Sequence, residues 1–344
     1  MCESLADIVA RCGGALETGA SVETVEYPLP AEASRELCEF WATEARMEMP
    51  PRFIARLPGG RVFGAGIVLS PDGKSIARDV SLDFGKPFER HWLLRGANLP
   101  PPKLVRGRTA VVASALSKGY GHWLLDELPR LLSLRRDEAD RVIAHGAPSF
   151  AALALARRGW TGAVLEAERT AHFQCDELVV PSLAGTVVWP TRSGIDLVAA
   201  FAASLPPEQS TFGERVYVTR ENARRRNVVN ERELWAELES AGFAKVRLEA
   251  LSWPEQIAAF RGAKIVVAPH GAGLANVIFC APATRVVECF NRSYVHGCFW
   301  RLAALCGLDY RPVVAAGAEP LGQATAANRR DICVDLAQVR AAIR

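Results

Sequence analysis

The amino-acid sequence predicts an α/β protein with two doubly wound lobes, each a mainly parallel sheet covered by helices. Three observations lead to this prediction. Strand-like and helix-like segments alternate in two successive series, over residues 108–181 and 215–289. A proline-bearing break at residues 204–207 separates the two series. Glycine-containing turns lead from strands into helices in both halves. The expected lobes are therefore residues 1–205 and 206–344.

The first lobe is expected to open irregularly, with a helix around residues 31–45 and β structure near 61–69 and 75–80, on either side of a turn at 70–73. Its alternating series then gives strands at 108–115, 141–144 and 176–181, and helices at 122–136 and 149–159. The second lobe is expected to have strands at 215–219, 245–249, 264–268 and 285–289, and helices at 230–241, at 253–261 and from 273. The sequence leaves open whether the last helix of the chain packs back on the first lobe.

Composition narrows the range of partners. The 344 residues are 49% hydrophobic and 23% charged, which suits two folded domains. The net charge is only +3, and the dense basic cluster Arg224–Arg226 favours a small phosphate ligand over nucleic acid. No run of about eighteen apolar residues is present, and Glu3 and Asp7 stand where a secretory signal would be basic and then apolar. The expected location is the cytoplasm, with peripheral association at the inner face of the plasma membrane as an alternative.

The nine cysteines indicate neither a disulfide framework nor a zinc site, because their number is odd and none forms a CxxC pair. Four of them lie near one another in the sequence at spacings that match no metal template, and we expect them to be buried thiols: Cys280, Cys289, Cys298 and Cys306.

The sharpest motif of the second half is a glycine turn between a strand and a helix, with the sequence His270-Gly271-Ala272-Gly273-Leu274-Ala275-Asn276. The glycines allow close approach of the backbone to a ligand, and the N-terminus of the following helix presents free N–H groups. This combination predicts an anion site suited to a diphosphate, with His270 donating to a phosphate oxygen. An ordinary strand-to-helix turn remains the alternative.

Polar side chains also follow the first strand of this half. Thr219 and Arg220 stand at its carboxyl end, and Arg225 lies in the arginine run just beyond. Arginine suits phosphate because its planar fork donates two parallel hydrogen bonds. Arg220 is the best placed, whereas we expect Arg226, the last of the run, to lie in solvent. Glu288 ends another strand and is interpreted either as a ribose acceptor or as an exposed strand-end residue.

The first half carries a candidate acid–base pair. The stretch from Gly119 to Leu131 follows a predicted strand and opens a helix near His122, which puts His122 and Asp126 one turn apart on the same face. A carboxylate held beside an imidazole can act as a general base. A carboxylate that only stabilises the start of the helix is the alternative. Pro129 predicts a break or kink just before it.

Three stretches in this order resemble the bacterial branch of glycosyltransferase family 61, often labelled capsular polysaccharide biosynthesis proteins. They are Tyr120 to Leu131 (YGHWLLDELPRL), Tyr217 to Arg220 (YVTR) with the arginine run, and Glu255 to Glu288, which contains HGAGLAN. The similarity covers about residues 110–290, and residues 1–100 match nothing recognisable. Gly119 departs from the family, whose members often carry asparagine there, so any contact made by that asparagine is in doubt.

The resemblance implies a GT-B-like pair of Rossmann lobes with an interlobe cleft, inversion at the anomeric carbon and no obligatory metal. It implies a nucleotide-sugar donor, of which a UDP-sugar is our choice, and a glycan or lipid-linked glycan acceptor in the synthesis of capsule, lipopolysaccharide or exopolysaccharide. It assigns Arg220 and the His270 turn to the donor and Asp126 to the catalytic base. The absence of an Asp-x-Asp triplet agrees with a metal-independent reaction and with no cofactor.

Two other functions fit these residues. One is another nucleotide-sugar enzyme of the same shape, such as an epimerase, which would alter the donor without an acceptor. The other is a catalytically silent nucleotide-sugar-binding protein, which would bind nucleotide without turnover. A phosphate-loop NTPase is excluded because the GxxxxGK[ST] pattern does not occur.

Overall fold

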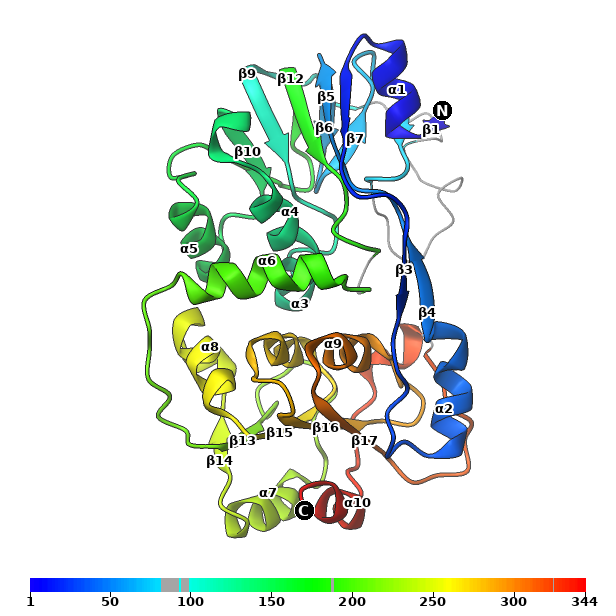
Figure 1. The fold of residues 1–344 in the computed structure, drawn as a ribbon, viewed down its shortest axis with the longest axis vertical. Coiled ribbons are helices and arrows are strands. Elements are labelled where there is room, and N and C mark those ends of the chain that lie inside the picture. Colours follow the sequence, from blue (N-terminus) through cyan, green and yellow to red (C-terminus); the bar gives the residue numbers. More distant parts are fainter. Residues whose placement is uncertain (82–92, 94–98, 187–188, 324) are drawn as a thin grey trace. The chain divides into compact units, whose positions relative to one another are not determined.

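The structure is a computed structural model that describes residues 1–81, 93, 99–186, 189–323 and 325–344 (Figure 1). It is a mixed α/β fold whose chain divides into two compact units. The first unit comprises Met1–Glu23 and Glu48–Val198, and the second comprises Thr24–Met47 and Ala199–Arg344. The division after Val198 lies within seven residues of the expected lobe boundary, but residues 24–47, which were expected in the first lobe, belong to the second unit.

The first unit contains a mixed sheet in the order β1-β8-β7-β6-β12-β9-β10-β11, with β5 and β2 joined to its side through β12. Its strands are β1 (Cys2–Glu3), β2 (Ala15–Thr18), β5 (Phe53–Pro58), β6 (Arg61–Phe63), β7 (Ile67–Leu69), β8 (Ile76–Ala77), β9 (Lys103–Val111), β10 (Arg141–Ala144), β11 (Val164–Glu166) and β12 (His172–Pro181). Its helices are α1 (Leu5–Arg11), α3 (Tyr120–His122), η4 (Trp123–Glu127), α4 (Leu128–Ser133), η5 (Arg136–Glu138) and α5 (Ser149–Arg157), while α6 (Arg192–Ala203) leads into the second unit.

Only part of this sheet is parallel. Strands β11, β10, β9 and β12 run parallel in that spatial order, whereas β5 and β6 pair antiparallel with β12. In sequence order the parallel strands therefore read 3-2-1-4, and the order reverses between β9 and β12, where such sheets bind ligands beyond the carboxyl ends of the strands. The doubly wound pattern expected for this half is confined to these four strands, because residues 53–77 form antiparallel strands with short turns instead of crossover helices.

The second unit has a five-stranded sheet that is parallel throughout, in the order β14-β13-β15-β16-β17. The strands are β13 (Arg215–Val218), β14 (Ala244–Val246), β15 (Ile265–Pro269), β16 (Arg285–Phe290) and β17 (Asp309–Val314). The helices are α2 (Arg35–Trp41), η1 (Ala42–Glu44), α7 (Glu231–Ser240), η6 (Leu248–Ala250), α8 (Trp253–Gly262), η7 (Ala272–Phe279), α9 (Cys298–Cys306), η8 (Thr325–Arg329) and α10 (Leu336–Ala342). Helices α8 and α9 cover one face of the sheet and α7 and α10 the other (Figure 1).

The strand order of this sheet, 2-1-3-4-5, reverses direction between β13 and β15. Ligands in open α/β sheets bind in the crevice outside the carboxyl ends of the strands at such a reversal. Buried side chains from β13, β15, β16, α7 and α10 form one hydrophobic core. Helix α10 contributes Val339 and Ala342 to that core, so the last helix packs on the sheet of the second unit.

An early segment of the chain completes the second unit. Strand β3 (Glu23–Glu26) precedes α2 in the chain and strand β4 (Arg46–Met49) follows it, and the two strands pair in a two-stranded sheet. Beyond it, Trp41 stacks on Trp300 with ring centroids 5.0 Å apart, and the Nε1–H of Trp300 donates to the carbonyl of Pro28 at 2.7 Å. Glu44 pairs with the buried guanidinium of Arg301. These contacts bury two tryptophan rings, which explains why a segment that looked irregular in the sequence is ordered here.

Two further findings bear on the sequence expectations. Cys280, Cys289 and Cys298 are buried, as expected, and Cys306 is half-buried. Burial raises the pKa of the Cys289 thiol to about 12. In the part of the chain that the structure describes, no helix is long and apolar enough to cross a membrane.

Candidate active site

The helix after β9 carries the candidate acid–base pair. It begins at Tyr120, where the N–H of Trp123 donates to the carbonyl of Gly119 at 2.9 Å, and it widens into a π-helical turn over Trp123–Glu127 before continuing as α4. The turn just precedes Pro129, whose ring cannot tolerate the carbonyl of an ordinary α-helical turn. The expected break at Pro129 therefore takes the form of a π turn, a feature common at functional sites.

Within this turn, Nδ1 of His122 lies 2.9 Å from Oδ2 of Asp126. The side chain of His122 is 29% exposed and that of Asp126 is 10% exposed, so solvent reaches the histidine more readily than the carboxylate. The i, i+4 pairing predicted from the sequence is thus present. Because Nδ1 is engaged with the carboxylate, the Nε2 atom of His122 is the ring nitrogen free to meet a ligand.

Glu127 and Arg130 hold this helix on the sheet through hydrogen bonds. The sequence analysis had assigned no role to either residue. Glu127 accepts hydrogen bonds from the backbone N–H and the ring of His145, at 2.9 and 2.8 Å, just after β10. Arg130 is fully buried and donates to four backbone carbonyls at or beyond the ends of β9 and β12, those of Val111, Val112, Ala113 and Pro181. Burial lowers the pKa of Arg130 to about 10. A buried arginine that satisfies four carbonyls fixes the position of the helix, and with it that of Asp126.

The second candidate cluster lies at the switch point of the parallel sheet. Arg220 follows β13, and His270 and Gly271 follow β15. The guanidinium of Arg220 packs against Gly271 so closely that a Cβ atom there would overlap Nη1. Gly271 is therefore required by this contact, and the structure brings together the two donor-binding elements predicted from the sequence.

Arg220 is a half-buried cation with spare hydrogen-bonding capacity. Its Nη2 donates to the carbonyl of Arg225 at 3.0 Å, while none of the described residues accepts from its buried Nε. Burial lowers its pKa to about 10, and repulsion from Arg226 and Arg225 adds to the effect. A site that holds several cations together in this way is stabilised when an anion enters it.

Arg226 also belongs to this cluster, which corrects the expectation that it lies in solvent. Its Nε donates to the carbonyl of His270 at 3.0 Å and its Nη1 to that of Asn328 at 3.1 Å, and its guanidinium lies 5.6 Å from the ring centroid of Tyr294. Its backbone has φ of 57°, which turns the chain back toward the sheet. This backbone conformation could not be predicted from the sequence, because the residue is not a glycine or an asparagine. Arg224 and Arg225 are exposed.

His270 is held by a buried carboxyl group. Its Nδ1 lies 2.5 Å from Oε1 of Glu288, and the hydroxyl of Tyr310 donates to the other oxygen of that group. Glu288 is 0% exposed, so the interpretation as an exposed strand-end residue is wrong, and both carboxyl oxygens are already bonded within the protein. Neither oxygen of Glu288 is therefore left to accept the hydrogen bonds that we expected from a ribose diol.

The protonation of this pair follows from its burial. Burial raises the pKa of Glu288 well above its usual range, and burial together with Arg226 and Arg220 lowers the pKa of His270. The pair therefore shares a proton that an exposed carboxylate would have lost. Wherever that proton lies between Oε1 and Nδ1, Nε2 of His270 also carries hydrogen and can donate to an anion.

The remaining predicted donor residues differ in accessibility. Thr219 is buried, and its hydroxyl donates to Glu231 and accepts from the N–H of Glu221. Asn276 is buried, and its amide donates to Gln256 at 3.1 Å. These two residues hold the loop and η7 in place, so their assignment as direct ligand contacts is not supported by the geometry. Ala272, the first residue of η7, is exposed, whereas Gly273 packs against Leu248.

Among the described residues, no group of three or more histidine, cysteine, aspartate or glutamate side chains could hold a metal ion. The positive charge of the second-unit cluster comes from Arg220 and Arg226.

A wholly parallel sheet with cationic side chains at its switch point is typical of a Rossmann-like α/β protein. Residues 120–287 match the family described as Glycosyltransferase 61. This match confirms the resemblance found in the sequence, although it does not distinguish the bacterial capsular branch. No curated protein matches the chain. The match supports glycosyltransferase activity, and glycosyltransferases in general use a nucleotide-sugar donor and a glycan acceptor.

Proposed function

We propose that the protein is an inverting glycosyltransferase that moves a sugar from a UDP-sugar to a glycan acceptor without a metal ion. The observation that carries the proposal is the group of three donors, Arg220, Arg226 and His270, at the switch point of a wholly parallel sheet. Synthesis of capsule, lipopolysaccharide or exopolysaccharide, and a GT-B-like arrangement of two lobes with a cleft, belong to the same proposal.

On the donor side, the diphosphate of the nucleotide sugar binds Arg220 and Nε2 of His270. Negative charge grows on the β-phosphate as the bond to the anomeric carbon breaks, and positioned hydrogen-bond donors stabilise that charge more in the transition state than in the ground state. The shared proton of His270 and Glu288 keeps Nε2 a donor at neutral pH. Metal independence is supported by this supply of positive charge.

On the acceptor side, Asp126 takes the proton from the attacking hydroxyl. The hydroxyl oxygen forms a bond to the anomeric carbon on the face opposite the nucleotide, the bond to the diphosphate breaks, and the proton passes to the carboxylate. His122 orients Asp126 through the 2.9 Å hydrogen bond. One displacement of this kind inverts the anomeric configuration, which is the stereochemical outcome that we propose.

A thermal-unfolding screen of nucleotide sugars tests the donor assignment. A ligand present at about 100 times its Kd stabilises the folded state by about 2.7 kcal/mol. We expect UDP-sugars to raise the melting temperature and inorganic phosphate at the same concentration to have a smaller effect. The best donor should then release UDP faster when a glycan acceptor is added. If no nucleotide sugar stabilises the protein, or if the donor sugar is altered without any acceptor, the proposal fails.

A further inference from the structure

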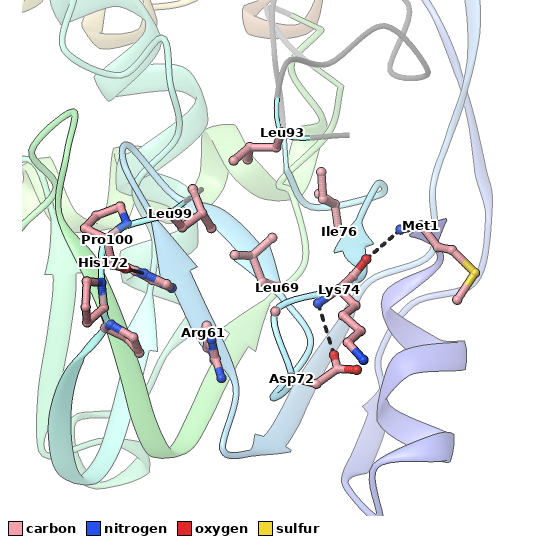
Figure 2. Close-up of a pocket in the computed structure, with 13 residues that line it drawn as sticks. Met1, Arg61, Leu69, Asp72, Lys74, Ile76, Leu93, Leu99, Pro100 and His172 are labelled. Atoms are coloured by element: carbon pink, nitrogen blue, oxygen red, sulfur yellow. Dashed lines mark hydrogen bonds between the residues drawn. The ribbon is translucent and has the colours of Figure 1, made fainter. Parts of the chain in front are cut away.

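A polar cavity lies in the first unit, at the amino ends of β12 and β9. Its volume is about 470 Å³, and its lining includes Arg61, Lys74, Leu99 and His172 (Figure 2). His172 is the first residue of β12, and Arg61 begins β6, which pairs antiparallel with it. The helix that carries Asp126 follows the carboxyl end of β9, so this cavity lies at the opposite end of the parallel strands.

His172 presents an unsatisfied ring nitrogen to the cavity. The residue is only 6% exposed, and its Nδ1 donates to the carbonyl of Pro100 at 2.6 Å. Nε2 is buried and has no hydrogen-bond partner among the described residues. Because a carbonyl can only accept, Nδ1 carries hydrogen, and in the neutral ring Nε2 is then an acceptor. A buried acceptor without a partner costs free energy that a ligand hydroxyl would recover.

Arg61 supplies a cation that is not neutralised by the described residues. Its Nε is buried without a hydrogen-bond partner, and none of the ion pairs in the described part of the chain includes it. Gly73 has φ of +75° and would place a Cβ atom 3.0 Å from Nη1 of Arg61, so a glycine at the turn leaves room for the guanidinium. The side chain therefore has donors available for an anion.

Besides Arg61, the charged groups that line the cavity are Asp72, Lys74 and the N-terminal ammonium of Met1, which donates to the carbonyl of Lys74 at 2.5 Å. Asp72 accepts from the hydroxyl of Ser70 at 2.5 Å and from the N–H of Lys74 at 3.1 Å, and these bonds lower the pKa of its carboxyl group. Asp72 thus remains ionised beside the exposed ammonium of Lys74 and offsets it. Figure 2 shows His172 and Pro100 on one side of the cavity, Lys74 and Asp72 on the other, and Arg61 between them.

The remaining wall is apolar and includes Leu69, Ile76, Leu99 and Pro101. A ligand that suits this cavity therefore has one negative charge for Arg61, a hydroxyl for Nε2 of His172 and a ring face of C–H groups for the apolar wall. A monosaccharide with a carboxylate combines these three properties.

We propose that this cavity is a binding site for an acidic sugar residue, held through its carboxylate by Arg61 and through a ring hydroxyl by His172. The site is separate from the proposed donor and acceptor positions and does not depend on the proposed function. It gives the protein a second place at which a carboxylated glycan binds.

Calorimetric titration of the full chain with sodium glucuronate tests the site, with glucose and inorganic phosphate as separate probes and no nucleotide present. We expect glucuronate to bind and glucose to bind at least about tenfold more weakly, since a hydrogen bond to a charged group accounts for that ratio or more. The variant Arg61→Gln should weaken glucuronate binding by at least about tenfold. The variant Arg106→Gln, at an exposed arginine of the same unit, should bind as the wild type does.

His172→Asn tests the second contact, because the asparagine amide can still donate toward Pro100 while Nε2 is lost. This variant should weaken glucuronate binding and leave phosphate binding unchanged. Melting temperatures of all variants show whether each has folded. The proposal is overturned if the wild type does not bind glucuronate, if Arg61→Gln binds it as well as the wild type, or if phosphate binds as tightly as glucuronate.

Discussion

Replacing Asp126 by asparagine separates a catalytic role from a structural one. The change keeps the shape of the side chain and an oxygen that accepts from Nδ1 of His122, now 2.9 Å away, but it removes the basicity of the group. A charge-assisted hydrogen bond becomes a neutral one, so the free energy of unfolding should fall by only about 1 kcal/mol. In a chain of this length that lowers the melting temperature by about 2 °C.

The effect on transfer should be much larger. General-base catalysis contributes about 10²–10⁴-fold to rate, and each factor of ten corresponds to about 1.4 kcal/mol of transition-state stabilisation. The expected loss of about 2.7–5.5 kcal/mol therefore exceeds the loss of stability. Donor affinity should hardly change, because the diphosphate is assigned to Arg220 and His270.

The assay measures initial rates of UDP release at saturating donor and acceptor, the Kd of UDP, and thermal unfolding. Asp137→Asn is the matched control, because that side chain lies in the same unit and is 79% exposed. It should retain wild-type turnover. If Asp126→Asn transfers sugar within about threefold of the wild-type rate while its melting temperature falls, Asp126 only stabilises the helix and the assignment of the base is wrong.

Three further outcomes are expected. Arg220→Ala should weaken UDP binding by about 1.5–3 kcal/mol, measured by calorimetry, whereas Arg224→Ala, at an exposed position, should leave it unchanged; equal losses would misplace the diphosphate. UDP binding should be the same with and without EDTA, and its disappearance on chelation would contradict the metal-free mechanism. Folding raises the pKa of Glu288 above 4.5, so between the unfolded and the folded pKa the folded state holds a proton that the unfolded state has lost. In that pH range the contribution of Glu288 to the free energy of unfolding falls with rising pH, by up to about 1.4 kcal/mol per pH unit. In urea unfolding from pH 5 to 8, the free energy of unfolding of Glu288→Gln should therefore rise relative to that of the wild type as the pH increases. The control variant Glu233→Gln should show no such trend. If the free energy of unfolding of Glu288→Gln and of the wild type depends on pH in the same way, the raised pKa is contradicted.

Features that depend on neighbouring residues in the chain were predictable from the sequence. The strand at 141–144 has the expected limits, and the strands and helices from 215 to 290 lie within a few residues of their predicted positions. The pairing of His122 with Asp126 also followed from local periodicity, because a helix fixes which side chains share a face. The glycine turn after β15 was recognisable for the same reason.

Features that depend on pairing between segments far apart in the chain were not predictable from the sequence. The burial of Glu288 follows from the neighbouring strand β17, which brings Tyr310 beside it, and that strand had not been predicted. Arg226 contacts His270 only because its backbone adopts a positive φ. In both cases the residue type was evident from the sequence, whereas tertiary contacts decided whether the side chain faces a ligand or the protein.

The segment Thr24–Met47 has a consequence for synthesis on the ribosome. Its packing partners, Trp300 and Arg301, follow it in the chain only after residues 48–198 of the first unit and most of the second unit, so Trp41 and Glu44 emerge long before these partners can cover them. At translation rates of about 5–20 residues per second, the delay is roughly 13–50 seconds. During that time an exposed indole is available to chaperones and to wrong partners. A fragment that begins at Ala199 would lack this segment permanently, and expression of the second unit alone is expected to give a misfolded product unless residues 24–47 are supplied.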